Sequence, residues 1–170
     1  SVTLTGDVKK DILFIDEVIG VKLALADHRS SNVTLDELIR LASDARVAGM
    51  LSGKAGIVTL HMGDDPQGLN KVFDAIKQTA IPAKVFHPTH VTRNPMLFEQ
   101  ALDFLELGGW IDPTAGSRKE KSCGDYIEAA KQRGLDTCRI TVSSDGQGSW
   151  STYDARGNLT QIGVSSVKAL

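Results

Sequence analysis

Four side chains that could together hold a divalent metal ion occur within or directly after short β-branched runs of the sequence: Lys22, His61, His90 and Asp145. Imidazole nitrogens and a carboxylate suit zinc or a similar divalent ion. A lysine is a poor ligand as an ammonium, but when it is buried and deprotonated beside divalent cations it can react with CO2. The resulting carbamate is anionic and bidentate and could bridge two metals.

Each of these residues also has an ordinary structural explanation. His61 or His90 alone could be a hydrogen-bonded histidine at a strand end. Lys22 could form a surface ion pair, and Asp145 precedes a glycine, which is common turn chemistry. The prediction of a metal site therefore depends on the joint arrangement of four suitable residues on four candidate strands.

The elements that would position these residues alternate between strands and helices, which is typical of repeated βα units and a parallel sheet. Predicted strands cover residues 20–26, 56–60, 84–88, 109–112 and 139–143. Predicted helices cover residues 35–51, 69–78, 95–107 and 124–133. The segment 149–164 is expected to be a loop or hairpin, and 165–170 a short helix. Parallel strands gather their carboxyl ends at one edge, so the four residues are aimed at one place.

Two helix starts carry their own signals. Thr34 followed by Glu37 predicts a capping box, in which the Thr34 hydroxyl accepts from a first-turn amide and the Glu37 carboxylate accepts from the amide of Thr34. Asn94 before Pro95 predicts a second start, because Asn caps well and Pro tolerates the first helical position. Glycines at 53, 108, 109 and 134 are placed where helices should end.

Composition excludes several classes of protein. The 170 residues are 41% hydrophobic with a formal net charge of -2, which is enough apolar material for a core and gives no nucleic-acid footprint. Charged residues interrupt every apolar stretch, so no membrane helix is expected. The two cysteines indicate a reducing, cytoplasmic setting. The chain begins at Ser1 within a segment that we expect to be a strand, as in a piece of a longer protein.

The fold class is α/β, and two architectures remain open at this point. The five predicted strands, roughly 30 residues apart, could form an open doubly wound sheet or part of a (β/α)8 barrel, which typically takes about 250 residues. Length alone favours the open sheet. The placement of polar residues at the strand ends favours the barrel.

Several long motifs carry a family resemblance: GVKLALADHRS at 20–30, HMGD at 61–64, PTHVTRN at 88–94, LFEQA at 97–101 and SSDGQGS at 143–149. In order and spacing they resemble the isoaspartyl dipeptidases, binuclear-zinc hydrolases of the amidohydrolase superfamily with a (β/α)8 barrel. The similarity runs along nearly the whole chain. It implies that residues 1–170 form the C-terminal half of the barrel, strands about four to eight, with the earlier strands and a small β-domain outside this chain.

The resemblance also implies roles for the candidate metal ligands. Lys22 matches the carbamylated lysine that bridges two zinc ions on the fourth barrel strand. His61 and His90 match the histidines that end the fifth and sixth strands and hold the second zinc. Asp145 matches the aspartate that follows the eighth strand, binds a zinc and shuttles the catalytic proton.

Substrate-binding roles follow from the same resemblance. Arg29 and Arg93 match arginines that hold the substrate carboxylate, and Ser149 matches a serine that contacts the substrate. This agrees with the chemistry of the guanidinium group, which grips a carboxylate bidentately. Alternatively, Arg29 could pair with Asp27, and Arg93 could simply lie at a helix start.

The implied reaction is hydrolysis of β-aspartyl dipeptides by a hydroxide that bridges two Zn2+ ions, in an enzyme expected to be a homo-oligomer. The sequence departs from the family in one important respect, since it contains no His-x-His pair to complete the first zinc site. We therefore expect the 170-residue chain alone to be inactive. Alternatives are another amidohydrolase acting on a small carboxylate-bearing or cyclic amide, such as a dihydroorotase-like enzyme or a deacylase, and a non-catalytic fragment that only binds metal or completes a barrel.

Overall fold

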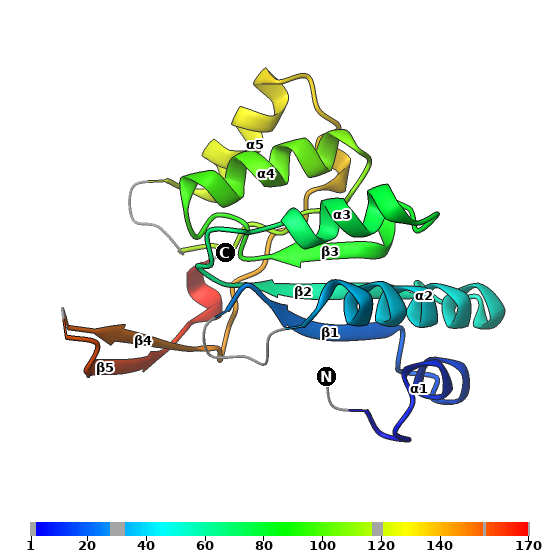
Figure 1. Ribbon diagram of the computed structural model, residues 1–170. Coiled ribbons are helices and arrows are strands. Elements are labelled where there is room, and N and C mark those ends of the chain that lie inside the picture. The colour runs from blue at the N-terminus through cyan, green and yellow to red at the C-terminus, as the bar shows by residue number, and fades with distance from the viewer. Residues whose placement is uncertain (1–2, 28–32, 117–120, 155, 170) are drawn as a thin grey trace.

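Three parallel strands form the central sheet of the computed structural model, which describes residues 3–27, 33–116, 121–154 and 156–169 (Figure 1). They are β1 (Gly20–Leu25), β2 (Ile57–Met62) and β3 (Phe86–Thr89), paired in that order. The register places Lys22 opposite Thr59 and Ala24 opposite His61. Each strand therefore presents equivalent positions to the same face of the sheet.

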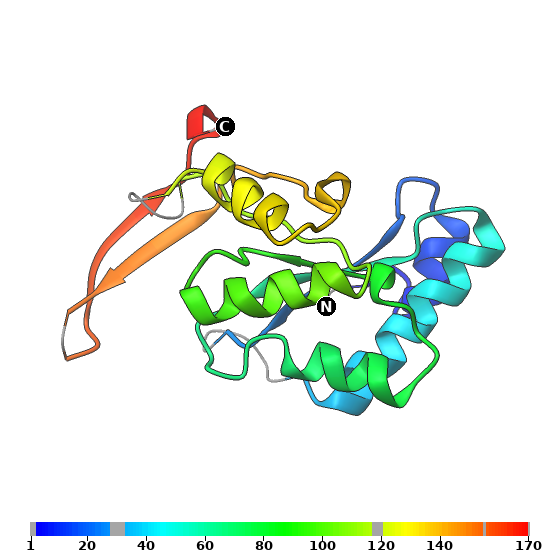
Figure 2. The ribbon, with the colours of Figure 1, turned by 90° about the horizontal axis from the view of Figure 1, so that it is seen from above.

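Helices lie along one face of this sheet, as the two views show (Figures 1 and 2). In the described part of the chain the α-helices are α1 (Val8–Phe14), α2 (Leu35–Ser52), α3 (Asn70–Gln78), α4 (Pro95–Glu106) and α5 (Cys123–Gln132). The capping box of Thr34 and Glu37 is present at the start of α2, and Asn94 caps α4 with Pro95 in its first turn. The α/β alternation predicted from the sequence is confirmed.

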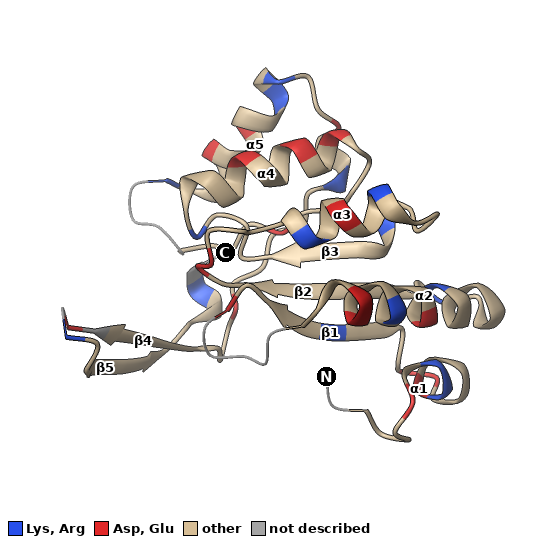
Figure 3. Cartoon of the chain, in the orientation of Figure 1, with Lys and Arg blue, Asp and Glu red and all other residues tan. Residues whose placement is uncertain are grey.

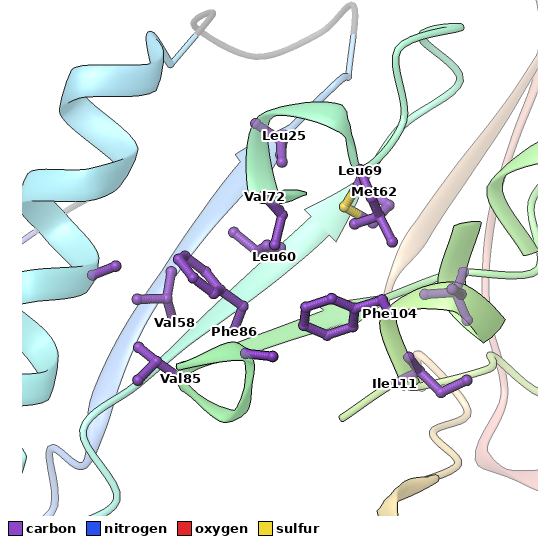
Figure 4. Close-up of a cluster of buried hydrophobic side chains, with 14 of the residues drawn as sticks. Leu25, Val58, Leu60, Met62, Leu69, Val72, Val85, Phe86, Phe104 and Ile111 are labelled. Carbon is purple, nitrogen blue, oxygen red and sulfur yellow. The ribbon is translucent and has the colours of Figure 1, made fainter. Parts of the chain in front are cut away.

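The core lies between the sheet and these helices (Figure 4). Val58, Leu60 and Met62 of β2 are fully buried, as are Phe86 of β3 and Phe104 of α4. Burying each such side chain contributes about 1.5–3 kcal/mol. One face of the sheet is thus apolar and packs against the helices. The opposite face carries polar side chains such as those of Thr59 and His61.

Two predicted strands, 109–112 and 139–143, are not continuous strands in the structure. They form isolated parallel bridges instead, joining Thr89 to Asp112, Ile111 to Ile140, and Thr114 to Ser143. One cause is Pro113, which has no N–H to donate to a ladder. Another is a 3-10 turn, Thr137–Arg139, that takes up the start of the second segment. The bridges still extend the parallel order β1-β2-β3 by two further segments.

The beginning of the chain differs more. A strand was expected at the start of the chain. In the described residues from Thr3 onward, the first element is instead the helix α1. Asp7 caps this helix by accepting from the amide of Lys10, and the buried Asp11 accepts from the amides of Leu4 and Thr5. These side-chain contacts favour a helix start over an extended segment. The strand predicted at 84–88 also begins later than expected, because a 3-10 turn covers Ala83–Val85 and β3 begins at Phe86.

The C-terminal region is the predicted hairpin, formed by β4 (Ser149–Tyr153) and β5 (Leu159–Val164), and it extends away from the sheet (Figure 1). A 3-10 turn, Val167–Ala169, follows it where a short helix was expected. Cys123 and Cys138 are free thiols. Among the described residues, no helix is long and apolar enough to cross a membrane.

Candidate metal-binding and catalytic site

Three segments that lead to the candidate site end in a residue with a left-handed backbone. Ala26 after β1 has φ 58°, His90 after β3 has φ 63°, and Asp145 has φ 47°. For residues other than glycine this conformation costs about 1–3 kcal/mol and persists only where the surroundings enforce it. Gln147, two residues past Asp145, is a fourth described non-glycine residue of this kind, with φ 67°. Such strain gathers at functional sites, and two of these four residues are predicted site residues.

His61 and His90 are in direct contact. The Nε2 atom of His90 lies 3.0 Å from Nδ1 of His61, and the ring centroids are 4.4 Å apart at an interplanar angle of 69°. Burial lowers the pKa of His90 to about 4, and the nearby positive charges of His61, Arg93 and Lys22 act in the same direction. The negative charge of Asp145 opposes this shift. At neutral pH this imidazole is therefore uncharged and carries a lone pair.

The outer nitrogens of both rings have partners that orient them. Nδ1 of His90 lies 2.7 Å from the hydroxyl of buried Thr114, and Nε2 of His61 lies 3.1 Å from the carboxylate of buried Asp27. Arg93 Nη2 is farther from the same His61 nitrogen, at 3.3 Å. The shorter contact to a carboxylate favours a proton on Nε2 of His61, and metal binding through Nε2 of His90 would require its proton on Nδ1, with Thr114 as the acceptor. The two inner nitrogens then face each other as lone pairs.

Two lone pairs at this separation suit a shared cation. Two imidazoles bound tetrahedrally to zinc at about 2.0–2.1 Å would have their nitrogens about 3.3 Å apart, close to the spacing found. A carboxylate or hydroxyl on the outer nitrogen is the usual second layer around a metal-binding histidine. The pair thus fits two positions of a divalent-ion site. Within the described residues, however, no group of three or more His, Cys, Asp or Glu side chains is placed to hold a metal.

Asp145 and Arg93 meet His90 at an open cleft of about 510 Å³. Thr114 and Ser144 line its wall, and Trp150 of β4 borders it. Of the buried side-chain polar atoms in the described part of the chain, one has no hydrogen-bond partner, and it is Nε of Arg93. An orphaned buried donor is rare and indicates an acceptor supplied from elsewhere. The arrangement could hold an anionic group beside the histidine pair.

The other predicted site residues are placed as follows. Lys22 lies on the same sheet face as His61, one register row away, and near enough for its charge to affect His90. It is exposed rather than buried, because β1 is the edge strand and pairs only with β2. Ser149 begins β4 and is exposed, and its neighbour Trp150 borders the cleft. Arg29 lies outside the described residues.

Sequence reasoning missed the partners of the histidines. Asp27 was considered only as an ion-pair partner of Arg29, and Thr114 was not considered at all. The strand-end rule could have found Asp27, since it follows β1 by two residues. Nothing local marks Thr114, because its contact with His90 joins residues 24 positions apart. A second cleft, of about 260 Å³ near the start of α4, contains none of the predicted site residues.

Comparison with known proteins gives one distant likeness of fold and a much more similar enzyme structure. No family model matches the sequence. The phosphotriesterase homology protein of Escherichia coli, crystallised with phosphate in its active site, superposes with a TM-score of 0.52 over 83% of this chain and 51% of its own. At 15% identity this shows a likeness of fold alone.

The chain is far more similar to the β-aspartyl dipeptidase of the thermophilic, keratin-degrading bacterium Fervidobacterium islandicum AW-1. The structure of that enzyme with the dipeptide β-Asp-Leu matches at 47% identity and a TM-score of 0.91 over 99% of this chain. A second structure of the enzyme matches at 44% identity and a TM-score of 0.84. The resemblance predicted from the motifs is therefore confirmed. The chain spans 45% and 43% of the length of these two relatives.

Proposed function

We propose that this chain supplies part of the active site of a metal-dependent β-aspartyl dipeptidase. The observation that carries the proposal is the 47% identity, over 99% of the chain, to an enzyme crystallised with β-Asp-Leu. The histidine pair and the orphaned Nε of Arg93 support it, because such a reaction needs a metal site beside a carboxylate-binding group. The five parallel segments, in chain order, support the further proposal that the sheet is half of a (β/α)8 barrel.

His61 and His90 would hold one of two zinc ions, and a carbamylated Lys22 and Asp145 would complete the donors from this chain. Bound there, the metal would supply an activated water and polarise the scissile carbonyl. Lys22 is exposed in the described residues, so the burial that would deprotonate its amine for reaction with CO2 would have to be supplied by the metals and by the part of the barrel outside this chain. The remaining donors would come from outside this chain, since the sequence holds no His-x-His pair.

The roles of the other residues follow from their positions. Arg93, which lines the cleft beside His90, would grip the carboxylate of the substrate, helped by Arg29 and Ser149. Asp145 faces the same cleft as His90 and would take a proton from the attacking water and deliver it to the leaving amine. One carboxylate would thus act first as a base and then as an acid.

Kinetics on the full-length enzyme test this proposal. We expect hydrolysis of β-Asp-Leu but not of the α-linked Asp-Leu, and loss of turnover in Asp145→Asn by about 10²- to 10⁴-fold. Chelation should abolish the activity and Zn2+ should restore it. Activity on N-acyl amino acids or dihydroorotate with none on β-Asp-Leu would refute the proposed substrate. Full turnover by Asp145→Asn would refute the proposed proton shuttle.

A further inference from the structure

A buried carboxylate outside the proposed metal site joins three segments of the sheet. Asp112 is 4% exposed and accepts hydrogen bonds from the hydroxyls of Thr89 and Thr141, each at 2.7 Å, and from that of Ser143. These donors lie 23 to 31 positions away in the sequence. A buried charge on this scale needs such partners, and hydrogen bonds to a carboxylate are among the stronger ones.

The direction of every hydrogen bond in this group is determined. An ionised carboxylate only accepts, so the three hydroxyl protons all point at Asp112. Thr141 has thereby used its proton, and its oxygen can only accept from Nε2 of His87, which lies 3.0 Å away. Asp112 therefore assigns the proton of His87 to Nε2, although the two residues share no direct hydrogen bond.

The same carboxylate is hydrogen-bonded to residues that shortly precede both strained site residues. Thr89 immediately precedes His90, and Ser143 is two residues before Asp145, and both of these site residues have positive φ. Asp112 is itself two residues before Thr114, the partner of the His90 ring. Strained backbone persists only where its surroundings fix it, and Asp112 fixes the residues that lead into both turns.

We propose that Asp112 is a positioning residue that holds His90 and Asp145 in their working places through Thr89 and Ser143. The importance of Asp112 for catalysis rests on the proposed function. The effects of Asp112 on hydrogen-bond direction and on the histidine pair do not rest on it, because both effects can be measured without substrate.

The test is Asp112→Asn in the full-length protein labelled with 15N histidine. An amide has one acceptor oxygen and an NH2 donor. If the oxygen keeps the hydroxyls of Thr89 and Ser143, the NH2 group faces Thr141, which must accept and turn its own proton toward His87. We expect His87 to change from the Nε2–H to the Nδ1–H tautomer in 15N spectra. We also expect Zn2+ affinity to fall by about 10- to 100-fold, as for second-layer residues elsewhere.

Asp103→Asn is the matched control, because this exposed carboxylate on α4 pairs with Arg133 and is remote from the network. It should leave the tautomer and the Zn2+ affinity unchanged. A folded Asp112→Asn with the same His87 tautomer and the same Zn2+ affinity as the parent would overturn the proposal.

Two single-hydroxyl variants keep the proposal testable if Asp112→Asn does not fold. Thr89→Val should lower Zn2+ affinity through His90. Ser143→Ala should lower kcat by about 10- to 100-fold at constant KM, because it displaces Asp145 from its reacting position. Unchanged Zn2+ affinity in folded Thr89→Val would contradict the positioning role. A parent protein that binds Zn2+ and shows the Nε2–H tautomer but does not hydrolyse β-Asp-Leu would refute the proposed function and leave this inference standing.

Discussion

The two faces of strand β2 differ completely in chemistry. Val58, Leu60 and Met62 point to the helices and are fully buried, whereas Thr59 and His61 point to the opposite face with the polar residues of β1 and β3. Charged side chains lie mainly on the helices and loops, and β2 and β3 carry none (Figure 3). One face thus holds the sheet in place, while the other carries the groups that could act on a substrate.

The largest expected effect concerns the polar face. We expect the 170-residue polypeptide alone not to hydrolyse β-Asp-Leu, because it offers two imidazoles in contact but no His-x-His pair. Supplying the N-terminal half of the related enzyme as a separate chain should restore some turnover, measured by release of leucine. If the isolated polypeptide hydrolysed β-Asp-Leu as fast as the complete enzyme, the polar face would not need metal ligands from outside this chain, and the prediction would be wrong.

The apolar face should give the next largest effect. Phe104→Ala removes a fully buried ring packed edge-on against Phe73 and should lower the free energy of unfolding by about 3–5 kcal/mol. Chemical denaturation of the full-length protein measures this loss. As a control, Leu107→Ala removes an exposed side chain just past the same helix and should change little. Equal losses in both variants would contradict the assignment of the core to this face.

Local signals in the sequence predicted most of the scaffold. The helix starts at Thr34 and Asn94 were readable because a cap depends on residues within one turn of it. The gathering of His61, His90 and Asp145 could be predicted because parallel strands end at one edge, whereas Arg93 was named only from the family resemblance. The Asp112 network was not, because its hydroxyl partners are brought together only by the folded sheet. The helix α1 that replaces the expected first strand also had local signals, the cap of Asp7 and the contacts of Asp11 with Leu4 and Thr5, and the strand prediction overlooked them.

Substrate grip by the polar face can be tested with a smaller change. Arg93→Lys keeps the charge but loses the bidentate fork, so KM for β-Asp-Leu should rise by about tenfold while kcat changes little. This expectation holds if the contact is equally strong in the ground and transition states. Arg133→Lys, a surface arginine paired with Glu99 and Asp103, should leave both constants as they are. A fall in kcat at constant KM would count against a simple binding role.

The smallest effect is a pH dependence of stability from His87. Burial, opposed by the charge of Asp112, lowers the pKa of His87 below its ordinary value of 6.5. The unfolded chain therefore binds this proton more readily, and the contribution of His87 to stability is present above pH 6.5 and lost as the pH falls below it. His87→Gln, which keeps an N–H donor for Thr141 but does not titrate, should show a shallower loss of stability as the pH falls below 6.5 in denaturation experiments. Parallel curves for the two proteins would exclude this contribution.

The most direct test of the division between the faces uses two adjacent residues of β2 in the full-length protein, with unfolding free energy and Zn2+ affinity measured for each. Leu60→Ala should lower the free energy of unfolding by about 2–5 kcal/mol and leave the Zn2+ affinity of the folded protein unchanged. His61→Ala should abolish high-affinity Zn2+ binding and change apo stability by only about 1 kcal/mol. The account would be contradicted if His61→Ala bound Zn2+ like the parent, or if Leu60→Ala lost Zn2+ binding while keeping its stability.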